Sequence, residues 1–199
     1  MQQKPIPQKW VSLICQLPDW ETAESCLAAL VHSEATPVAV ELLAGPTQSE
    51  AVTAVAGDGV AVLAVCCCGT EPEVDWMQQQ LQQEWQSQGL SAHVLVSAEH
   101  DALWEDLVEF PAAGPHALAL QASLVPSGVI DFVREVQAID PQASILAHAG
   151  NGLVVVKMPE LPEAGLTEVV VRKLQPLARR SQGNVVVLSA EGATDLSHR

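Results

Sequence analysis

Basic residues are scarce in this chain, and their scarcity excludes two classes of partner. The sequence contains nine lysines and arginines against 24 aspartates and glutamates, which gives a formal net charge of −15. Nucleic acids and anionic membranes both attract clustered positive charge. The one local cluster consists of Arg172, Lys173, Arg179 and Arg180 on an expected helix. We therefore expect a chain that binds neither nucleic acid nor a membrane surface.

Long apolar runs are missing as well. No run approaches the roughly 20 residues that a membrane helix needs, and the first ten residues, MQQKPIPQKW, lack the apolar centre of a secretory signal. The five cysteines include the contiguous Cys66, Cys67 and Cys68, which end an apolar run typical of a buried strand. Alternation along a strand sends neighbouring thiols to opposite faces, away from any shared metal. We expect unpaired thiols, no metal site and a cytoplasmic location.

The sequence also lacks the common catalytic and phosphate-binding motifs. Gly-x-Gly-x-x-Gly, Gly-x-x-x-x-Gly-Lys and Gly-x-Ser-x-Gly are all absent, as are His-x-x-x-His and Cys-x-x-Cys pairs. Five of the six histidines are expected at helix ends, on strand faces or in loops, without a catalytic role: His32, His93, His100, His116 and His198.

What the chain does contain is a repeated alternation of strand-like and helix-like runs. In the first half, strands are predicted at 10–17, 37–44, 59–69 and 92–98, with helices at 20–33 and 71–88. Asp19 and Thr70 are the expected N-caps of these helices. In the second half, strands are predicted at 117–124, 143–150, 152–158 and 184–190, with helices at 127–138 and 161–180. At 3–4 spacing, Val74, Met77, Leu81 and Trp85 give the helix at 71–88 an apolar face.

Both halves therefore have the element order β-α-β-β-α-β, which is that of the ferredoxin-like unit. We predict an α+β fold with two such units, a largely antiparallel sheet and helices on one face. The units are expected at 1–98 and 117–199, joined by a connecting helical segment at 99–116. The connection at 45–59 is expected to be a long loop of the kind that often carries function.

One hairpin stands out in the second half, in the segment ILAHAGNGLVVV at 145–156. Gly150, Asn151 and Gly152 tolerate the positive φ of tight turns, so they predict the turn itself. The turn does not require the histidine before it, His148. Two interpretations remain open: His148 caps the strand and hydrogen-bonds a neighbouring loop, or it serves chemistry.

Two segments of the second half resemble a known family. LQASLVPSGVIDFV (120–133) and AHAGNGLVVV (147–156) are similar to the C-terminal, substrate-side domain of FAD-linked oxidases of the vanillyl-alcohol oxidase type. Within that family they look most like the FAD-binding subunit of bacterial glycolate oxidase. The resemblance implies a duplicated α+β domain. It also implies an FAD cofactor bound mainly by a domain not present in this chain, so that the chain alone is expected to be inactive.

The resemblance also implies roles for particular residues. His148 matches an active-site hairpin, where an imidazole takes the proton of the substrate hydroxyl or holds its carboxylate. Asn151 is expected to donate a hydrogen bond to that carboxylate or to the flavin edge. Gly150 and Gly152 of the same hairpin are expected near substrate or cofactor. So are Gln121, Ser123 and Ser127, which are polar residues of a strand and a helix start that lie close by in the predicted topology. In related 2-hydroxy-acid dehydrogenases the hairpin reads His-x-Gly-Asp-Gly-Asn-x-His and holds a metal. This hairpin supplies only the first histidine, so no metal is carried over.

The function implied is oxidation of a small 2-hydroxy acid such as glycolate. The partners implied are an FAD domain of the same polypeptide and other oxidase subunits, including an iron–sulfur protein. The alternative is a non-catalytic pair of ferredoxin-like modules that binds a metabolite or a protein.

Overall fold

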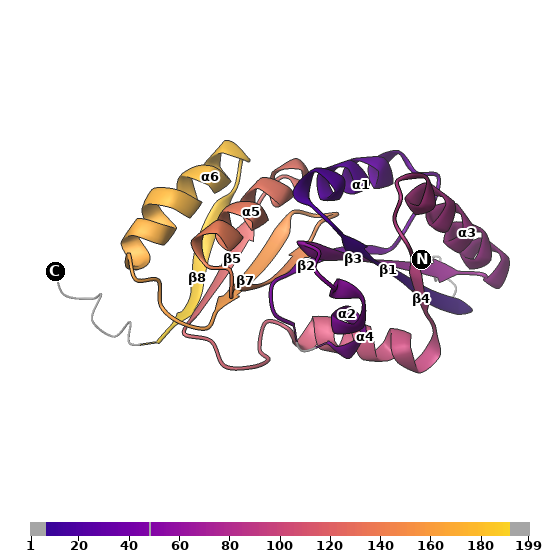
Figure 1. The fold of residues 1–199 in the computed structure, drawn as a ribbon, viewed down its shortest axis with the longest axis horizontal. Coiled ribbons are helices and arrows are strands. Elements are labelled where there is room, and N and C mark those ends of the chain that lie inside the picture. The colour runs from indigo at the N-terminus through magenta and orange to yellow at the C-terminus, as the bar shows by residue number, and fades with distance from the viewer. Residues whose placement is uncertain (1–6, 48, 192–199) are drawn as a thin grey trace, which may run out of the picture. The chain divides into compact units, whose positions relative to one another are not determined.

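The computed structural model describes residues 7–47 and 49–191, which form two compact units (Figure 1). The first unit runs to Leu42 and then from Thr47 to Val108, and the second contains Leu43–Pro46 and continues from Glu109. The described residues are α+β, with eight strands and six α-helices. Every strand pair of known register is antiparallel.

The sheet of the first unit has the strand order β4-β1-β3-β2. Its strands are β1 (Lys9–Leu17), β2 (Ala39–Ala44), β3 (Ala61–Gly69) and β4 (His93–Leu95). β1 pairs with β3 along its whole length and with β4 on its other side. Because β1 is central, every residue from Val11 to Cys15 is buried. The apolar run at 10–17 thus forms the middle of the core, as its composition predicts.

Two helices begin and pack as their sequences predict. They are α1 (Trp20–His32) and α3 (Glu71–Ser87). Asp19 caps α1, because its Oδ1 accepts a hydrogen bond of 2.7 Å from the backbone N–H of Thr22. The apolar stripe predicted for α3 is buried in full, with Val74, Met77, Leu81 and Trp85 turned inward.

Two further helices correct the predicted arrangement of the first unit. α2 (Glu50–Ala56) and α4 (Ser97–Glu109) lie on the opposite side of the sheet from α1 and α3 (Figure 1). The expectation of helices on one face is therefore wrong here, and the connection at 45–59 contains a helix where a loop was expected. The period of a helix identifies its apolar stripe but does not say which face of a sheet that stripe covers.

The sheet of the second unit has the strand order β6-β7-β5-β8. Its strands are β5 (Leu118–Ser123), β6 (Ser144–His148), β7 (Leu153–Met158) and β8 (Asn184–Ala190). β7 pairs with both β6 and β5, and β5 also pairs with β8. β8 ends this order and is the most exposed of the four strands.

The helices of the second unit share one side of its sheet. They are the 3₁₀ turn η1 (Pro126–Gly128), α5 (Val129–Ile139), the π-helical segment η2 (Thr167–Leu174) and α6 (Gln175–Arg180). Figure 1 shows α5 and α6 on the same side of β5, β7 and β8. The helical segment predicted from residue 161 begins only at Thr167, because a turn precedes it. In this turn the backbone N–H of Gly165, whose φ is 84°, donates a hydrogen bond to the carbonyl oxygen of Pro162. In the described part of the chain, no helix has the length and apolarity needed to cross a membrane.

Candidate functional site

The predicted hairpin is present, and His148 is the last residue of its first strand. β6 ends at His148 and β7 begins at Leu153, so four residues connect them. The carbonyl oxygen of His148 accepts hydrogen bonds from the backbone N–H groups of Asn151 at 3.1 Å and Gly152 at 2.9 Å. The backbone of the histidine therefore closes the turn, while its half-buried side chain projects from the end of the strand.

The two glycines of the turn are not equivalent. Gly152 has a φ of +78°, and a Cβ there would lie 1.9 Å from the carbonyl oxygen of Leu124. Gly150 does not have positive φ, and a Cβ there would meet no atom within 4 Å. The expectation that both glycines fix the turn is therefore wrong: Gly152 alone is required by its conformation and by its close approach to Leu124.

Asn151 contributes first to the turn. Its Oδ1 accepts a hydrogen bond of 3.1 Å from the backbone N–H of Leu153, the first residue of β7. This is the local side-chain bond that favours asparagine in turns. The side chain is exposed, so the amide nitrogen still faces solvent at the tip of the hairpin.

The strand register brings three of the predicted residues to one face of the sheet. His148 on β6 and Ser123 on β5 both lie opposite Leu153 on β7, so His148, Leu153 and Ser123 form one row across the three strands. Gln121 lies two positions before Ser123 on β5 and therefore points to the same face. At about 4.8 Å between neighbouring strands, the Cα atoms of His148 and Ser123 are on the order of 10 Å apart.

The face that carries His148 is only partly polar. Next to the row of His148, Leu153 and Ser123, it contains Gln121 with the buried side chains of Val155 and Leu146. On the other face, the row of Ala122, Val154 and Ala147 is fully buried and apolar. At the other end of the face that carries His148, the Nζ of Lys157 donates hydrogen bonds of 2.6 Å to two carbonyl oxygens of the segment 110–113. That segment therefore contacts the Lys157 end of this face.

Ser127 does not join this group. It is exposed in η1, in the segment that enters α5, four residues beyond Ser123. Among the residues that the structure describes, no three His, Cys, Asp or Glu side chains form a group able to hold a metal ion. The group around His148 thus offers one imidazole, one hydroxyl and two carboxamides, which suits hydrogen bonding and proton transfer.

A second polar cluster, not predicted from the sequence, lies in the first unit. Ser12 is fully buried in β1, and its Oγ accepts a hydrogen bond of 2.7 Å from the indole N–H of Trp104. The same Oγ is 2.8 Å from Nδ1 of His100. His100 and Trp104 are four residues apart on α4 and so share one face of that helix. The sequence feature that could have indicated this cluster is Ser12, the lone serine in an apolar strand, because a buried hydroxyl group needs a hydrogen-bond partner.

The ionisation of this cluster argues against nucleophilic catalysis. Cys66 lies opposite Ser12 on β3. Burial raises the pKa of the Cys66 thiol to about 12. Burial also lowers the pKa of His100, against the opposing effect of Asp101. The thiol is therefore protonated and the imidazole neutral at physiological pH, whereas a reactive cysteine needs a thiolate.

Comparison with known proteins relates the chain to larger ones through its fold. No protein-family model matches the chain, and no curated protein matches its sequence. Two crystal forms of alkyldihydroxyacetonephosphate synthase, P1 and P212121, superpose with TM-scores of 0.54 and 0.53 at 12% identity, and each match covers 91% of this chain. The VAO-type flavoprotein MtVAO615 from Myceliophthora thermophila C1 matches 88% of the chain and 39% of its own, at 13% identity and a TM-score of 0.44.

The matches with alkyldihydroxyacetonephosphate synthase show a shared fold. The chain spans about 40% of the length of those structures. The α+β architecture of this chain therefore also occurs as one part of a larger protein, alkyldihydroxyacetonephosphate synthase.

Proposed function

We propose that this chain is the substrate-side domain of an FAD-dependent oxidoreductase that oxidises a small 2-hydroxy acid such as glycolate. The observation that carries the proposal is the face shared by His148, Ser123 and Gln121. These residues come from the two segments that resemble FAD-linked oxidases. The fold shared with part of a larger synthase chain is consistent with a domain that acts together with others.

We also propose that the two units are copies of a ferredoxin-like module. Numbered within each unit, the strands follow the order 4-1-3-2 in both: β4-β1-β3-β2 in the first and β8-β5-β7-β6 in the second. The element order β-α-β-β-α-β recurs once α2 and α4 are set aside as additions to the first copy.

The proposed reaction converts a 2-hydroxy acid into a 2-oxo acid. The substrate loses a hydride from its α-carbon and a proton from its hydroxyl group, and FAD, when bound, supplies the hydride acceptor. The imidazole of His148 accepts the hydroxyl proton, or its protonated form holds the substrate carboxylate. The amide nitrogen of Asn151 donates a hydrogen bond to that carboxylate in this proposal, while its Oδ1 accepts the hydrogen bond from the backbone N–H of Leu153.

The residues of this chain fit the reacting end of the cofactor rather than its pyrophosphate. Gln121 and Ser123 place an amide and a hydroxyl on the same face as His148, where they suit the polar edge of a planar ring. The sequence has no glycine-rich phosphate motif. FAD is therefore held mainly by a domain of the same polypeptide that precedes this one, and an iron–sulfur subunit is the proposed route for electrons onward.

The test is the turnover of His148→Ala and His148→Gln variants in the polypeptide or complex that includes the FAD domain. With glycolate as substrate, kcat per bound flavin is expected to fall by roughly 10²–10⁴-fold, the usual contribution of a positioned acid–base group. Flavin content and the free energy of unfolding are expected to change little, because the side chain is only half buried.

His93→Ala is the matched control, since His93 is exposed on a strand of the other unit. It is expected to leave kcat unchanged. A His148→Ala variant with turnover within about threefold of the wild type and a lowered melting temperature would show that His148 only caps the strand.

A further inference from the structure

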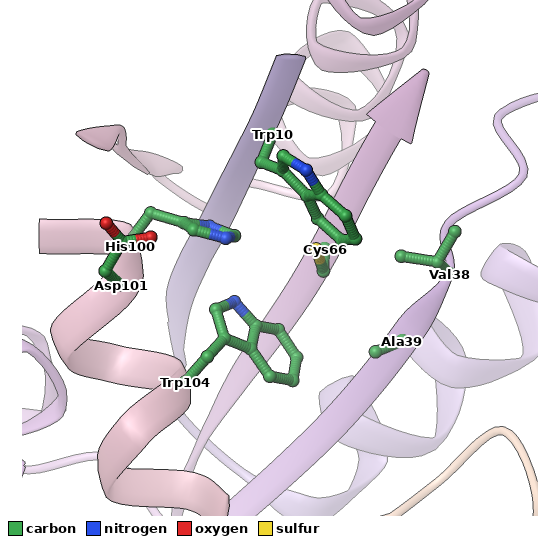
Figure 2. A pocket seen from close by; sticks show the side chains of 7 residues that line it. All are labelled: Trp10, Val38, Ala39, Cys66, His100, Asp101 and Trp104. Atoms are coloured by element: carbon green, nitrogen blue, oxygen red, sulfur yellow. The ribbon is translucent and has the colours of Figure 1, made fainter. Parts of the chain in front are cut away.

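We propose that the first unit binds a small quaternary ammonium cation in the open cavity lined by Trp10, His100 and Trp104 (Figure 2). The cavity has a volume of about 370 Å³. This volume is at the lower end of the range for ligand pockets, so the ligand is small. The cavity is lined only by residues of the first unit, and the proposal does not rest on the oxidoreductase function.

Three aromatic rings form a concave wall. The ring centroids of Trp10 and His100 are 6.1 Å apart with their planes at 43°, and those of His100 and Trp104 are 6.3 Å apart at 46°. Rings tilted in this way do not stack on one another. Figure 2 shows them around one space, with Cys66 between the two indoles. The face of an indole attracts cations through its quadrupole, and cages of such rings bind methylated ammonium groups.

Two rings of the wall, those of Trp104 and His100, are held in place before any ligand binds. The indole N–H of Trp104 is used in the hydrogen bond to Ser12, so this ring presents its carbon face and not its donor to the cavity. Nδ1 of His100 is bound to the same oxygen, which is fully buried. Fixed rings reduce the entropy lost on binding.

The charge at the cavity also selects a cation. None of its seven lining residues, all within the described ranges, is a lysine or arginine. The one charged residue among them is Asp101 on α4, at the edge of the cavity, with its carboxylate on the side of His100 away from the two indoles (Figure 2). The imidazole of His100 is neutral at physiological pH, because burial lowers its pKa. The chain as a whole carries a net charge of −15, which favours cations over anions in its vicinity.

The test is titration of the purified chain with choline and with 3,3-dimethyl-1-butanol, its neutral isostere, at constant ionic strength. Calorimetry or tryptophan fluorescence is expected to show choline binding at least tenfold more tightly than the alcohol. Tetramethylammonium is expected to behave as choline does, because the methylated cation is the recognised group.

Two variants and one control locate the site. Trp10→Leu is expected to weaken choline binding roughly tenfold by removing one wall, and Asp101→Asn several-fold by removing the carboxylate. Trp76→Leu is the matched control: Trp76 is 45% exposed, as Trp10 is 46% exposed, but it lies on α3. Equal binding of choline and its neutral isostere would overturn the proposal, as would choline affinity unchanged in both Trp10→Leu and Asp101→Asn. Asp101 is exposed, so the second variant tests the site even if the first does not fold.

Discussion

Gly152 is the residue whose identity the β6–β7 hairpin depends on most. Its backbone takes a conformation that L-residues rarely adopt, and its Cα packs against the carbonyl group of Leu124. The backbone N–H of Leu124 in turn donates a 2.8 Å hydrogen bond to the carbonyl oxygen of Gly152. This contact joins the hairpin to the end of β5 and so fixes where His148 lies relative to Ser123.

Gly152→Ala is therefore expected to lower the free energy of unfolding by about 2 kcal/mol or more, from backbone strain and the clash with Leu124 together. Gly150→Ala is the matched control in the same turn. It is expected to change stability by less than about 1 kcal/mol, with a small gain favoured because alanine restricts the unfolded chain. Urea denaturation of both variants measures the difference, and equal losses in the two would contradict the geometry described for this turn.

At the scale of single elements, the start of α3 depends on a short hydrogen-bonded group. The carboxylate of Glu73 accepts hydrogen bonds from the backbone N–H of Thr70 at 2.9 Å and from its hydroxyl at 2.6 Å. These bonds, with the hydroxyl contributing most, lower the pKa of Glu73 below its usual value. A carboxyl group with a lowered pKa stabilises the fold above the pKa that it has when unfolded. That stabilisation is lost as the pH falls through its folded pKa.

Thr70→Val is expected to raise the pKa of Glu73 toward its ordinary value and to lower the melting temperature by a few degrees at neutral pH. The difference from the wild type is expected to shrink as the pH falls through the folded pKa of Glu73. Carboxyl NMR titration and melting curves across this range measure both effects. Thr53→Val is the control, because its hydroxyl donates to the carbonyl oxygen of Ser49 and not to a carboxylate. A Thr70→Val effect that stays constant with pH would argue against this account.

At the scale of the whole molecule, the chain has the fold of part of a larger protein, and its two candidate sites lie in different units. The face with His148 is in the second unit, and the aromatic cage is in the first. The two proposals therefore fail or succeed separately. If the proposed function holds, loss of choline binding in Trp10→Leu is expected to leave glycolate turnover intact in the polypeptide that includes the proposed FAD domain.

The 199-residue chain, purified alone, is expected to retain no FAD. The cofactor's pyrophosphate needs backbone donors of the kind that a glycine-rich loop supplies, and the sequence has no such motif. Gel filtration after incubation with FAD, followed by the visible absorption spectrum of the protein peak, measures this. Stoichiometric flavin in that peak would mean that the domain binds the cofactor by itself.

Several features of the protein follow from the sequence alone, because they depend on local chemistry. The eight strands and the helices α1, α3 and α5 follow from apolar periodicity, whereas α2 was not predicted. The N-cap at Asp19 and the buried stripe of α3 follow from residue type and spacing. The hairpin after His148 follows from the glycines and the asparagine that make its turn.

Other features were decided only by the tertiary structure. A connecting helical segment was expected at 99–116, but not that a helix from Ser97 to Glu109 covers the second face of the sheet. There His100 and Trp104 meet Ser12 across 88 and 92 residues of sequence. Strand pairing, which depends on contacts distant in sequence, placed His148 and Ser123 in one row. The need for glycine at 152 but not at 150 came from the approach of Leu124, another part of the chain. Local sequence specifies which elements form, whereas the packing of distant segments determines which side chains face each other.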